Sequence, residues 1–203
     1  MTRQQRRSIR LKGYDYSTAG AYFVTVCADG RALLFGDIVD DAVRLNPCGM
    51  VVSETWDALP VHYVYVSLDA FIVMPNRVHG IILFDDRADA LVGADLTTQT
   101  SGTKSVGAGF KPAPTSGGIV GSGAGLKPAP TRHGLPEIVR AFKTFSAKRI
   151  NDLRGTPGAP VWQRNYYEHV VRDERALNRI RQYIAENPVR WADDPDNPKT
   201  WRP

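Results

Sequence analysis

Two apolar runs separated by a Pro-Asn pair stand near the middle of the chain. Phe71–Met74 and Val78–Phe84 are rich in β-branched and aromatic residues, and Pro75-Asn76 between them is a turn signal, so we expect a β-hairpin. Arg77 and His79 fall on its second strand. Because successive strand residues point to opposite faces, these two side chains share one face, about 6.6 Å apart along the strand. The hairpin therefore presents a polar pair on an otherwise apolar strand.

The segments before this hairpin alternate between strand and helix patterns. Ala21–Ala28 predicts a strand, and Asn46-Pro47 opens a helix in which Asn46 is the N-cap and Pro47 lies in the first turn. We expect Pro60 to stop that helix. The stretch Leu33–Val43 is ambiguous, and a short hairpin is one interpretation of it.

Apolar positions at helical spacing predict two further helices, Leu135–Ile150 and a final helix from about Asp173 to Asn187. Between them, Val161–Val171 indicates a strand pair or one bent strand. The last helix has an apolar stripe of Leu177, Ile180 and Ile184. Beside it runs a polar stripe spaced by four residues: Arg175, Arg179, Tyr183 and Asn187. A boundary tyrosine and a helix-ending asparagine before Pro188 have the same spacing, so spacing alone leaves the function open.

Residues 85–134 interrupt these patterns. They are rich in Gly, Ser, Thr and Pro, and Gly107–Thr115 recurs with one substitution as Gly123–Thr131. Two copies are too few for a solenoid, so we interpret the segment as a flexible insertion. We expect residues 1–203 to form one domain, with a basic N-terminal arm at residues 1–20.

The charge of the chain favours a polyanionic partner. The 203 residues are 42% hydrophobic, enough for one buried core, and carry a net charge of +5. Five basic residues precede the first acid, Asp15: Arg3, Arg6, Arg7, Arg10 and Lys12. Such an arm neutralises phosphates, although a solvated tail has the same composition.

Cysteine usage and hydropathy indicate the compartment. Only Cys27 and Cys48 occur, with no metal-ligand spacing, which favours a reduced protein. No apolar run approaches ~18 residues, and no apolar segment of a signal peptide follows the basic arm. We therefore expect a cytoplasmic protein that does not bind membranes.

Five spaced motifs carry a resemblance to a known family. They are Arg7–Tyr16, Tyr22–Val26, Met74–His79, Trp162–Tyr167 and Tyr183–Pro188. In this order they resemble the REP-associated tyrosine transposases, bacterial relatives of the single-tyrosine insertion-sequence transposases. The likeness covers nearly the whole chain apart from residues 85–134. It implies an α/β (α+β) ferredoxin-like sandwich, an antiparallel sheet with helices packed on it, which agrees with the order of elements above.

The resemblance also implies a reaction and a partner. In such enzymes a helix tyrosine attacks a phosphodiester of single-stranded DNA beside a repeated palindromic hairpin, leaving a 5′-phosphotyrosine and a free 3′-hydroxyl. Tyr183 matches this nucleophile, and His79 and Asn187 match two ligands of the Mg²⁺ or Mn²⁺ ion that polarises the phosphate. The resemblance favours a monomer over a homodimer. The arm residues Arg3, Arg6, Arg7, Arg10 and Lys12 are our candidates for the hairpin stem, and Arg175 and Arg179 are further DNA-binding candidates.

Arg77 departs from this family pattern, because it stands where the first metal-binding histidine is expected. A guanidinium stays protonated and cannot ligate a cation, so metal affinity should fall. Arg77 either grips the phosphate in place of the metal or leaves the site inactive for strand cleavage. We expect DNA binding with impaired transposase activity. The alternative functions are a catalytically inactive hairpin DNA-binding protein and an RNA-binding regulatory protein.

Aromatic side chains in the predicted strands are candidates for stacking on unpaired bases. They are Tyr63, Tyr65, Trp162, Tyr166 and Tyr167. Strand aromatics usually pack into a core, so we expect most of them to be buried. His169 is either a structural histidine or a substitute metal ligand.

Overall fold

The structure is a computed structural model that describes residues 13–85 and 133–197. Its strands are β1 (Gly20–Cys27), β2 (Gly36–Val39), β3 (Ala42–Leu45), β4 (Val66–Met74), β5 (Arg77–Phe84) and β6 (Tyr167–Val171). The helices are α1 (Pro47–Asp57), α2 (Leu59–His62), α4 (Leu135–Arg154) and α5 (Glu174–Glu186), with 3₁₀ turns η1 (Asp29–Arg31) and η2 (Trp191–Asp193).

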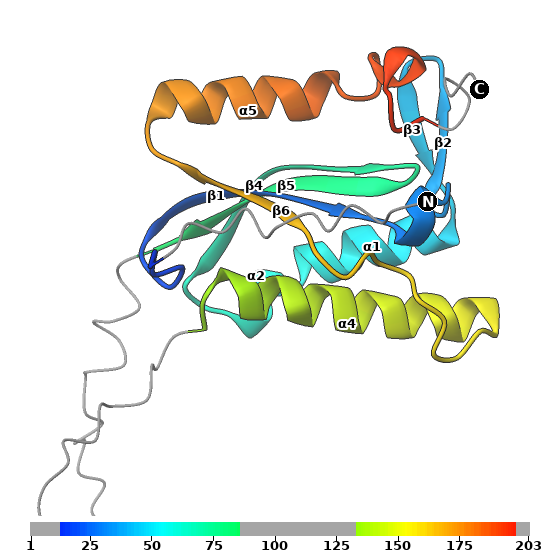
Figure 1. Ribbon diagram of the computed structural model, residues 1–203, viewed down its shortest axis with the longest axis horizontal. Helices are drawn as coiled ribbons and strands as arrows, with labels where there is room; N and C mark the ends of the chain where they lie inside the picture. The colour runs from blue at the N-terminus through cyan, green and yellow to red at the C-terminus, as the bar shows by residue number, and fades with distance from the viewer. Residues whose placement is uncertain (1–12, 86–132, 198–203) are drawn as a thin grey trace, which may run out of the picture.

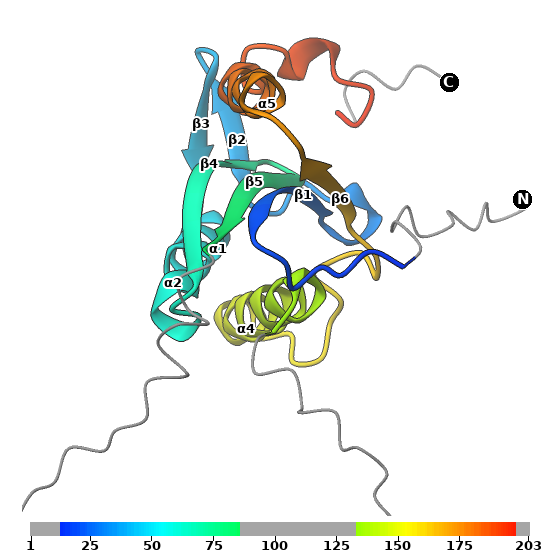
Figure 2. The same ribbon diagram turned by 90° about the vertical axis from the view of Figure 1, so that its left-hand side faces the viewer.

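Four strands form one sheet in the order β4-β5-β1-β6, and every neighbouring pair is antiparallel. Figures 1 and 2 show three layers: α5 lies on one face of this sheet, and α1 and α4 lie on the other. The chain order of strands and helices with this sheet order confirms the predicted ferredoxin-like sandwich. Strands β2 and β3 pair separately as the short hairpin that was one interpretation of Leu33–Val43.

The face of the sheet toward α1 and α4 holds the larger core. Trp56 of α1 stacks on Phe71 with ring centroids 4.5 Å apart, and its edge meets Phe142 of α4 at 5.4 Å. Gly80 of β5 faces this indole, and a Cβ there would lie 2.4 Å from the ring. Glycine at position 80 therefore lets the tryptophan approach the strand backbone closely.

The opposite face, toward α5, holds a smaller apolar cluster. Its buried members are Phe23, Ile81, Val171, Leu177 and Ile184, and Ile180 packs against them. The predicted apolar stripe of α5 is thus confirmed. Asp173 caps the helix by accepting a 2.7 Å hydrogen bond from the Ala176 amide, and Arg181 pairs with Asp69 of β4 at 2.6 Å. These contacts fix α5 across the strands.

Two predictions about element boundaries are wrong. Helix α1 ends at Asp57, and Pro60 lies in the first turn of α2 rather than stopping α1, because a first-turn residue needs no amide hydrogen. In the stretch Val161–Val171 only β6 is a strand of the sheet. Trp162 forms an isolated bridge with Ala28, so the stretch is neither a strand pair nor one continuous strand.

Other predictions lie outside the described residues. These are the contacts of Arg3, Arg6, Arg7, Arg10 and Lys12, and most of the repeat-containing insertion at 85–134. Within residues 13–85 and 133–197, no helix is both long and apolar enough to cross a membrane.

Candidate functional site

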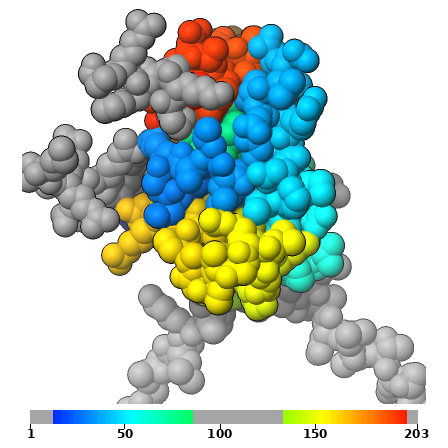
Figure 3. Space-filling view, turned by 90° about the vertical axis from the view of Figure 1, so that its right-hand side faces the viewer, coloured from blue at the N-terminus to red at the C-terminus, as the bar shows by residue number. Residues whose placement is uncertain are grey.

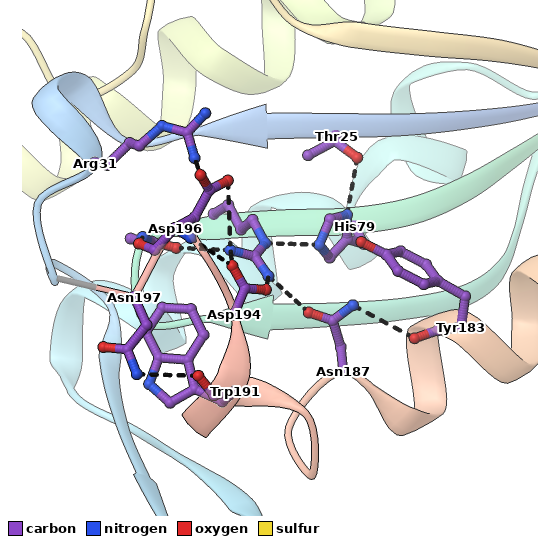
Figure 4. A network of polar contacts seen from close by, with 11 residues as sticks. Thr25, Arg31, His79, Tyr183, Asn187, Trp191, Asp194, Asp196 and Asn197 are labelled. Carbon is purple, nitrogen blue, oxygen red and sulfur yellow. Dashed lines mark hydrogen bonds and ion pairs between the residues drawn. The ribbon is translucent and has the colours of Figure 1, made fainter. Parts of the chain in front are cut away.

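The structure brings together four residues that the sequence singled out. Arg77 and His79 project from β5 toward α5, Tyr183 lies in the last turns of α5, and Asn187 is its C-cap. The alternation of β5 explains the first pair, since positions 77, 79 and 81 share the face that α5 covers. Figure 4 shows His79, Tyr183 and Asn187 close together, and Arg77 joins them through hydrogen bonds to His79 and Asn187.

His79 is buried and held by two hydrogen bonds. Its side chain is 2% exposed, its Nε2 accepts from Arg77 Nε at 2.8 Å, and its Nδ1 lies 2.8 Å from Thr25 Oγ1. Because Nε2 is an acceptor, the ring proton stays on Nδ1 and is donated to Thr25. Burial, followed by the charge of Arg77, lowers the pKa of His79 to about 3. The imidazole is therefore neutral at physiological pH.

Arg77 is the centre of the site, although only 3% of it is exposed. Besides donating to His79, it donates from Nη2 to Asn187 Oδ1 at 2.9 Å. Both terminal nitrogens contact the carboxylate of Asp194, and the guanidinium carbon lies 5.3 Å from the centroid of the Trp191 ring. A buried guanidinium with these partners is a fixed cation.

The segment Trp191–Asn197 belongs to this site and was not anticipated from the sequence. Asp196 pairs with Arg31, and its carbonyl accepts from Asn76 Nδ2 at 2.7 Å. In Figure 3 this C-terminal segment, coloured red, lies at the surface beside the blue and light-blue residues of the first part of the chain. The sequence signal is acidic: three aspartates, Asp193, Asp194 and Asp196, follow the helix that carries Tyr183 and Asn187.

The residues present do not fit the divalent metal that the family resemblance implies. His79 Nε2 and Asn187 Oδ1, the expected ligand atoms, both accept hydrogen bonds from Arg77. A metal would have to displace a guanidinium that is itself paired with Asp194. Among the residues that the structure describes, no cluster of three or more His, Cys, Asp or Glu side chains is placed to hold a metal ion.

Tyr183 is the exposed member of the site. It is 43% exposed, and its ring meets the rings of His79 and Phe23 edge-on at centroid distances of 5.3 and 6.1 Å. Figure 4 shows its hydroxyl end directed toward His79. The tyrosine is therefore oriented by the site and accessible to a ligand from solvent.

A groove lies beside β6 and the first half of α5. Its volume is about 460 Å³, and its lining includes Tyr167, His169, the cations Arg172 and Arg179, and the acids Glu168 and Asp173. Arg175 and Arg179 are both exposed on α5, but only Arg179 reaches the groove. His169 lines the groove and is exposed there.

Most of the aromatic side chains that we expected in strands belong to the core or pack against it, as predicted, although only Tyr167 lies within a strand. Tyr65 and Trp162 are buried, and Tyr63 and Tyr166 pack against the same core. Tyr167 is the exception, at 41% exposed. It is therefore the member of this set that remains accessible for stacking.

Comparisons with known proteins place the chain in a family. No family model matches it. An uncharacterized protein of Haemophilus influenzae (strain Rd) is 34% identical over 192 residues, which span 93% of this chain and 91% of that one. The chain therefore belongs to the same family as the Haemophilus influenzae protein.

Two solved structures are more distantly similar. One is the REP-associated tyrosine transposase bound to a REP hairpin, with a TM-score of 0.48 and 16% identity over 94% of this chain and 74% of that one. The other is a candidate transposase of Deinococcus radiodurans R1, with a TM-score of 0.41 and 17% identity over 87% of this chain and 96% of that one.

Proposed function

We propose that this protein binds single-stranded DNA that carries hairpins, through the α5 surface around Tyr183. The observation that carries the proposal is the meeting of Tyr183, His79 and Asn187 at one place, with Tyr183 accessible. These residues lie in two of the five motifs that resemble the REP-associated tyrosine transposases. The metal position of that family is filled by Arg77, so we assign binding rather than metal-dependent cleavage to the site.

We place the unpaired part of the strand in the groove beside β6. Arg172 and Arg179 supply charge for phosphates, and the exposed ring of Tyr167 supplies a stacking surface, which is worth ~1–3 kcal/mol per base. Phe23 connects the groove to Tyr183, since the centroid of its ring lies 6.1 Å from the ring centroids of both Tyr167 and Tyr183. The hairpin stem is assigned to the basic arm of Arg3, Arg6, Arg7, Arg10 and Lys12.

Fluorescence anisotropy with labelled hairpin and unstructured strands tests the proposal. The double variant Arg172→Ala/Arg179→Ala should bind the hairpin strand at least tenfold more weakly. Its plot of log affinity against log salt should become less steep by about 1.4, the slope for two phosphate contacts on a single strand. The matched control is Arg140→Ala/Arg154→Ala, which removes the same charge from the exposed side of α4. Equal losses in both double variants would mean that only net charge matters.

The binding proposal is wrong if the protein does not prefer hairpin strands over unstructured ones. A matched RNA hairpin distinguishes the RNA-binding alternative, because tighter binding to RNA than to DNA of the same sequence would favour it. Removing residues 2–12 should reduce the preference for hairpins. It should leave unchanged the affinity for unpaired strands, which we assign to the groove.

Strand cleavage is the second candidate function, favoured by the exposure of Tyr183 and by the direction of its hydroxyl end toward His79. In this reaction the phenol loses its proton as its oxygen bonds to phosphorus, the phosphorus bond to the 3′-oxygen breaks, and that oxygen takes up one proton and leaves as a hydroxyl, so no net proton is gained or lost. Denaturing gels of the protein with a labelled hairpin strand, in Mn²⁺ and in EDTA, test it. A covalent adduct that Tyr183→Phe abolishes would establish cleavage, whereas binding without an adduct supports the first proposal.

A further inference from the structure

We propose that the guanidinium of Arg77 is the permanent cation of this site. It occupies the position of a divalent metal ion, and Asp194 is its counter-ion. The site then needs no metal ion to organise His79, Asn187 and the end of α5. This inference concerns the protein without nucleic acid, so it holds or fails independently of the proposed DNA ligand.

The position of the guanidinium carries the inference. Two different nitrogens of one side chain reach the two expected ligand atoms: Nε reaches His79 Nε2 at 2.8 Å, and Nη2 reaches Asn187 Oδ1 at 2.9 Å. The positive group therefore lies between the same lone pairs that would face a metal ion. One acceptor comes from β5 and the other from the C-cap of α5, so the cation joins two elements as a bridging metal would.

The surrounding charges match a monovalent cation. A buried guanidinium is costly to desolvate unless it is paired and hydrogen-bonded. Asp194 contacts both of its terminal nitrogens, and Asp196 lies 3.9 Å from Nη1. Trp191 adds an aromatic face 5.3 Å from the guanidinium carbon. The segment after α5 thus supplies the partners that make a fixed charge tolerable at this place.

The same geometry indicates what happens when the guanidinium is removed. In the variant Arg77→His, the new imidazole would share the strand face with His79, and Asp194 would lose its contacts with the guanidinium. Two imidazoles, one carboxylate and the amide oxygen of Asn187 would then surround the position that the guanidinium fills in the wild type. Nitrogen and oxygen donors of this kind bind Mn²⁺ and Co²⁺. Arg77→His should therefore create a metal site at the place where the wild type holds a guanidinium.

Titration of the full chain with Mn²⁺, followed by electron paramagnetic resonance, and with Co²⁺, followed by visible absorption, tests the inference without any activity assay. We expect Arg77→His to bind one equivalent of metal at least tenfold more tightly than the wild type. Adding His79→Ala to that variant should abolish the gain. Arg31→His is the matched control, because it places a histidine next to Asp196 but away from the position of the Arg77 guanidinium. Its metal affinity should equal that of the wild type.

The wild type provides a second measurement that needs no variant to fold. Its thermal midpoint should be the same in EDTA and in 1 mM Mn²⁺, and the resonance signal of free Mn²⁺ should not change when the wild-type protein is added. One equivalent of bound Mn²⁺ in the wild type, removed by His79→Ala, would overturn the inference. So would a folded Arg77→His variant, judged by circular dichroism, that binds no metal.

Discussion

The two faces of the central sheet are built on different principles. The face toward α1 and α4 is apolar and dominated by interlocked rings such as Trp56, Phe71 and Phe142. The face toward α5 buries fewer apolar side chains and places the charged pair of Arg77 and Asp194 beside them. Both faces of β5 are buried, so the difference lies in chemistry rather than in depth.

This difference separates stability from function within one strand. Apolar burial is favourable without a specific partner, so it suits the face that holds the fold together. Buried charges are favourable only while every partner is present, so they add little net stability but fix one arrangement of β5, α5 and the C-terminal segment. The predictions below perturb one face at a time.

The largest effect is expected from Trp56→Ala on the apolar face. Truncating a fully buried tryptophan leaves a cavity between Phe71 and Phe142 and should lower the free energy of unfolding by about 4 kcal/mol. Urea denaturation measures this, and Met50→Ala, at an exposed position of the same helix, is the control and should change stability by less than about 0.5 kcal/mol. Similar losses in the two variants would contradict this view of the core.

Asp194→Asn is the matching perturbation of the polar face. It leaves the buried guanidinium with a neutral partner and should cost about 2 to 3 kcal/mol, less than a fully buried pair because the carboxylate is 18% exposed. When Arg77→Met is already present, Asp194→Asn should cost far less. The double-mutant cycle should therefore give a coupling energy above about 1 kcal/mol. Asp69→Asn, which breaks the more exposed pair with Arg181, should cost only about 0.5 kcal/mol. Additive losses at Arg77 and Asp194 would show that the two charges do not depend on each other.

The sequence predicted those parts of the site whose cause is local. Strand alternation placed Arg77 and His79 on one face, and capping chemistry with helical spacing placed Tyr183 and Asn187 at the end of one helix. Both patterns follow from backbone geometry, so they are readable within a few residues.

The partners of Arg77 were not predictable in this way. Asp194 is separated from Arg77 by 117 residues and lies in a segment with no apolar period, so no local pattern records the pairing. Pro60 was misjudged for a related reason: a proline ends one helix or begins the next, and the preceding turn at Ala58 decides between them. Long-range contacts made by single side chains are visible only in the folded chain.

A pH series separates the two faces by their titration behaviour. His79 has a pKa of about 3 when folded and about 6.5 when unfolded, so between these values the unfolded chain binds more protons. Its contribution to stability is complete above pH 6.5 and is lost as the pH falls toward 3, amounting to about 2 kcal/mol between pH 7 and pH 5. Chemical denaturation across this range should therefore show a smaller loss in His79→Gln than in the wild type. Parallel pH profiles of the two proteins would contradict the buried, neutral imidazole.

The smallest effects are expected from removing a tyrosine hydroxyl on each face. Tyr22 is fully buried on the α1 and α4 face, and its hydroxyl donates to the Thr18 carbonyl at 2.7 Å, so Tyr22→Phe should cost about 1 kcal/mol. Tyr183 is 43% exposed on the other face, so Tyr183→Phe should change stability by less than about 0.5 kcal/mol. Hairpin affinity should stay within twofold in both variants, because the ring of Tyr183 is retained. Thermal denaturation and anisotropy measure the two quantities. A larger loss of stability in Tyr183→Phe than in Tyr22→Phe would mean that the α5 face depends on this hydroxyl for folding rather than keeping it accessible for a ligand.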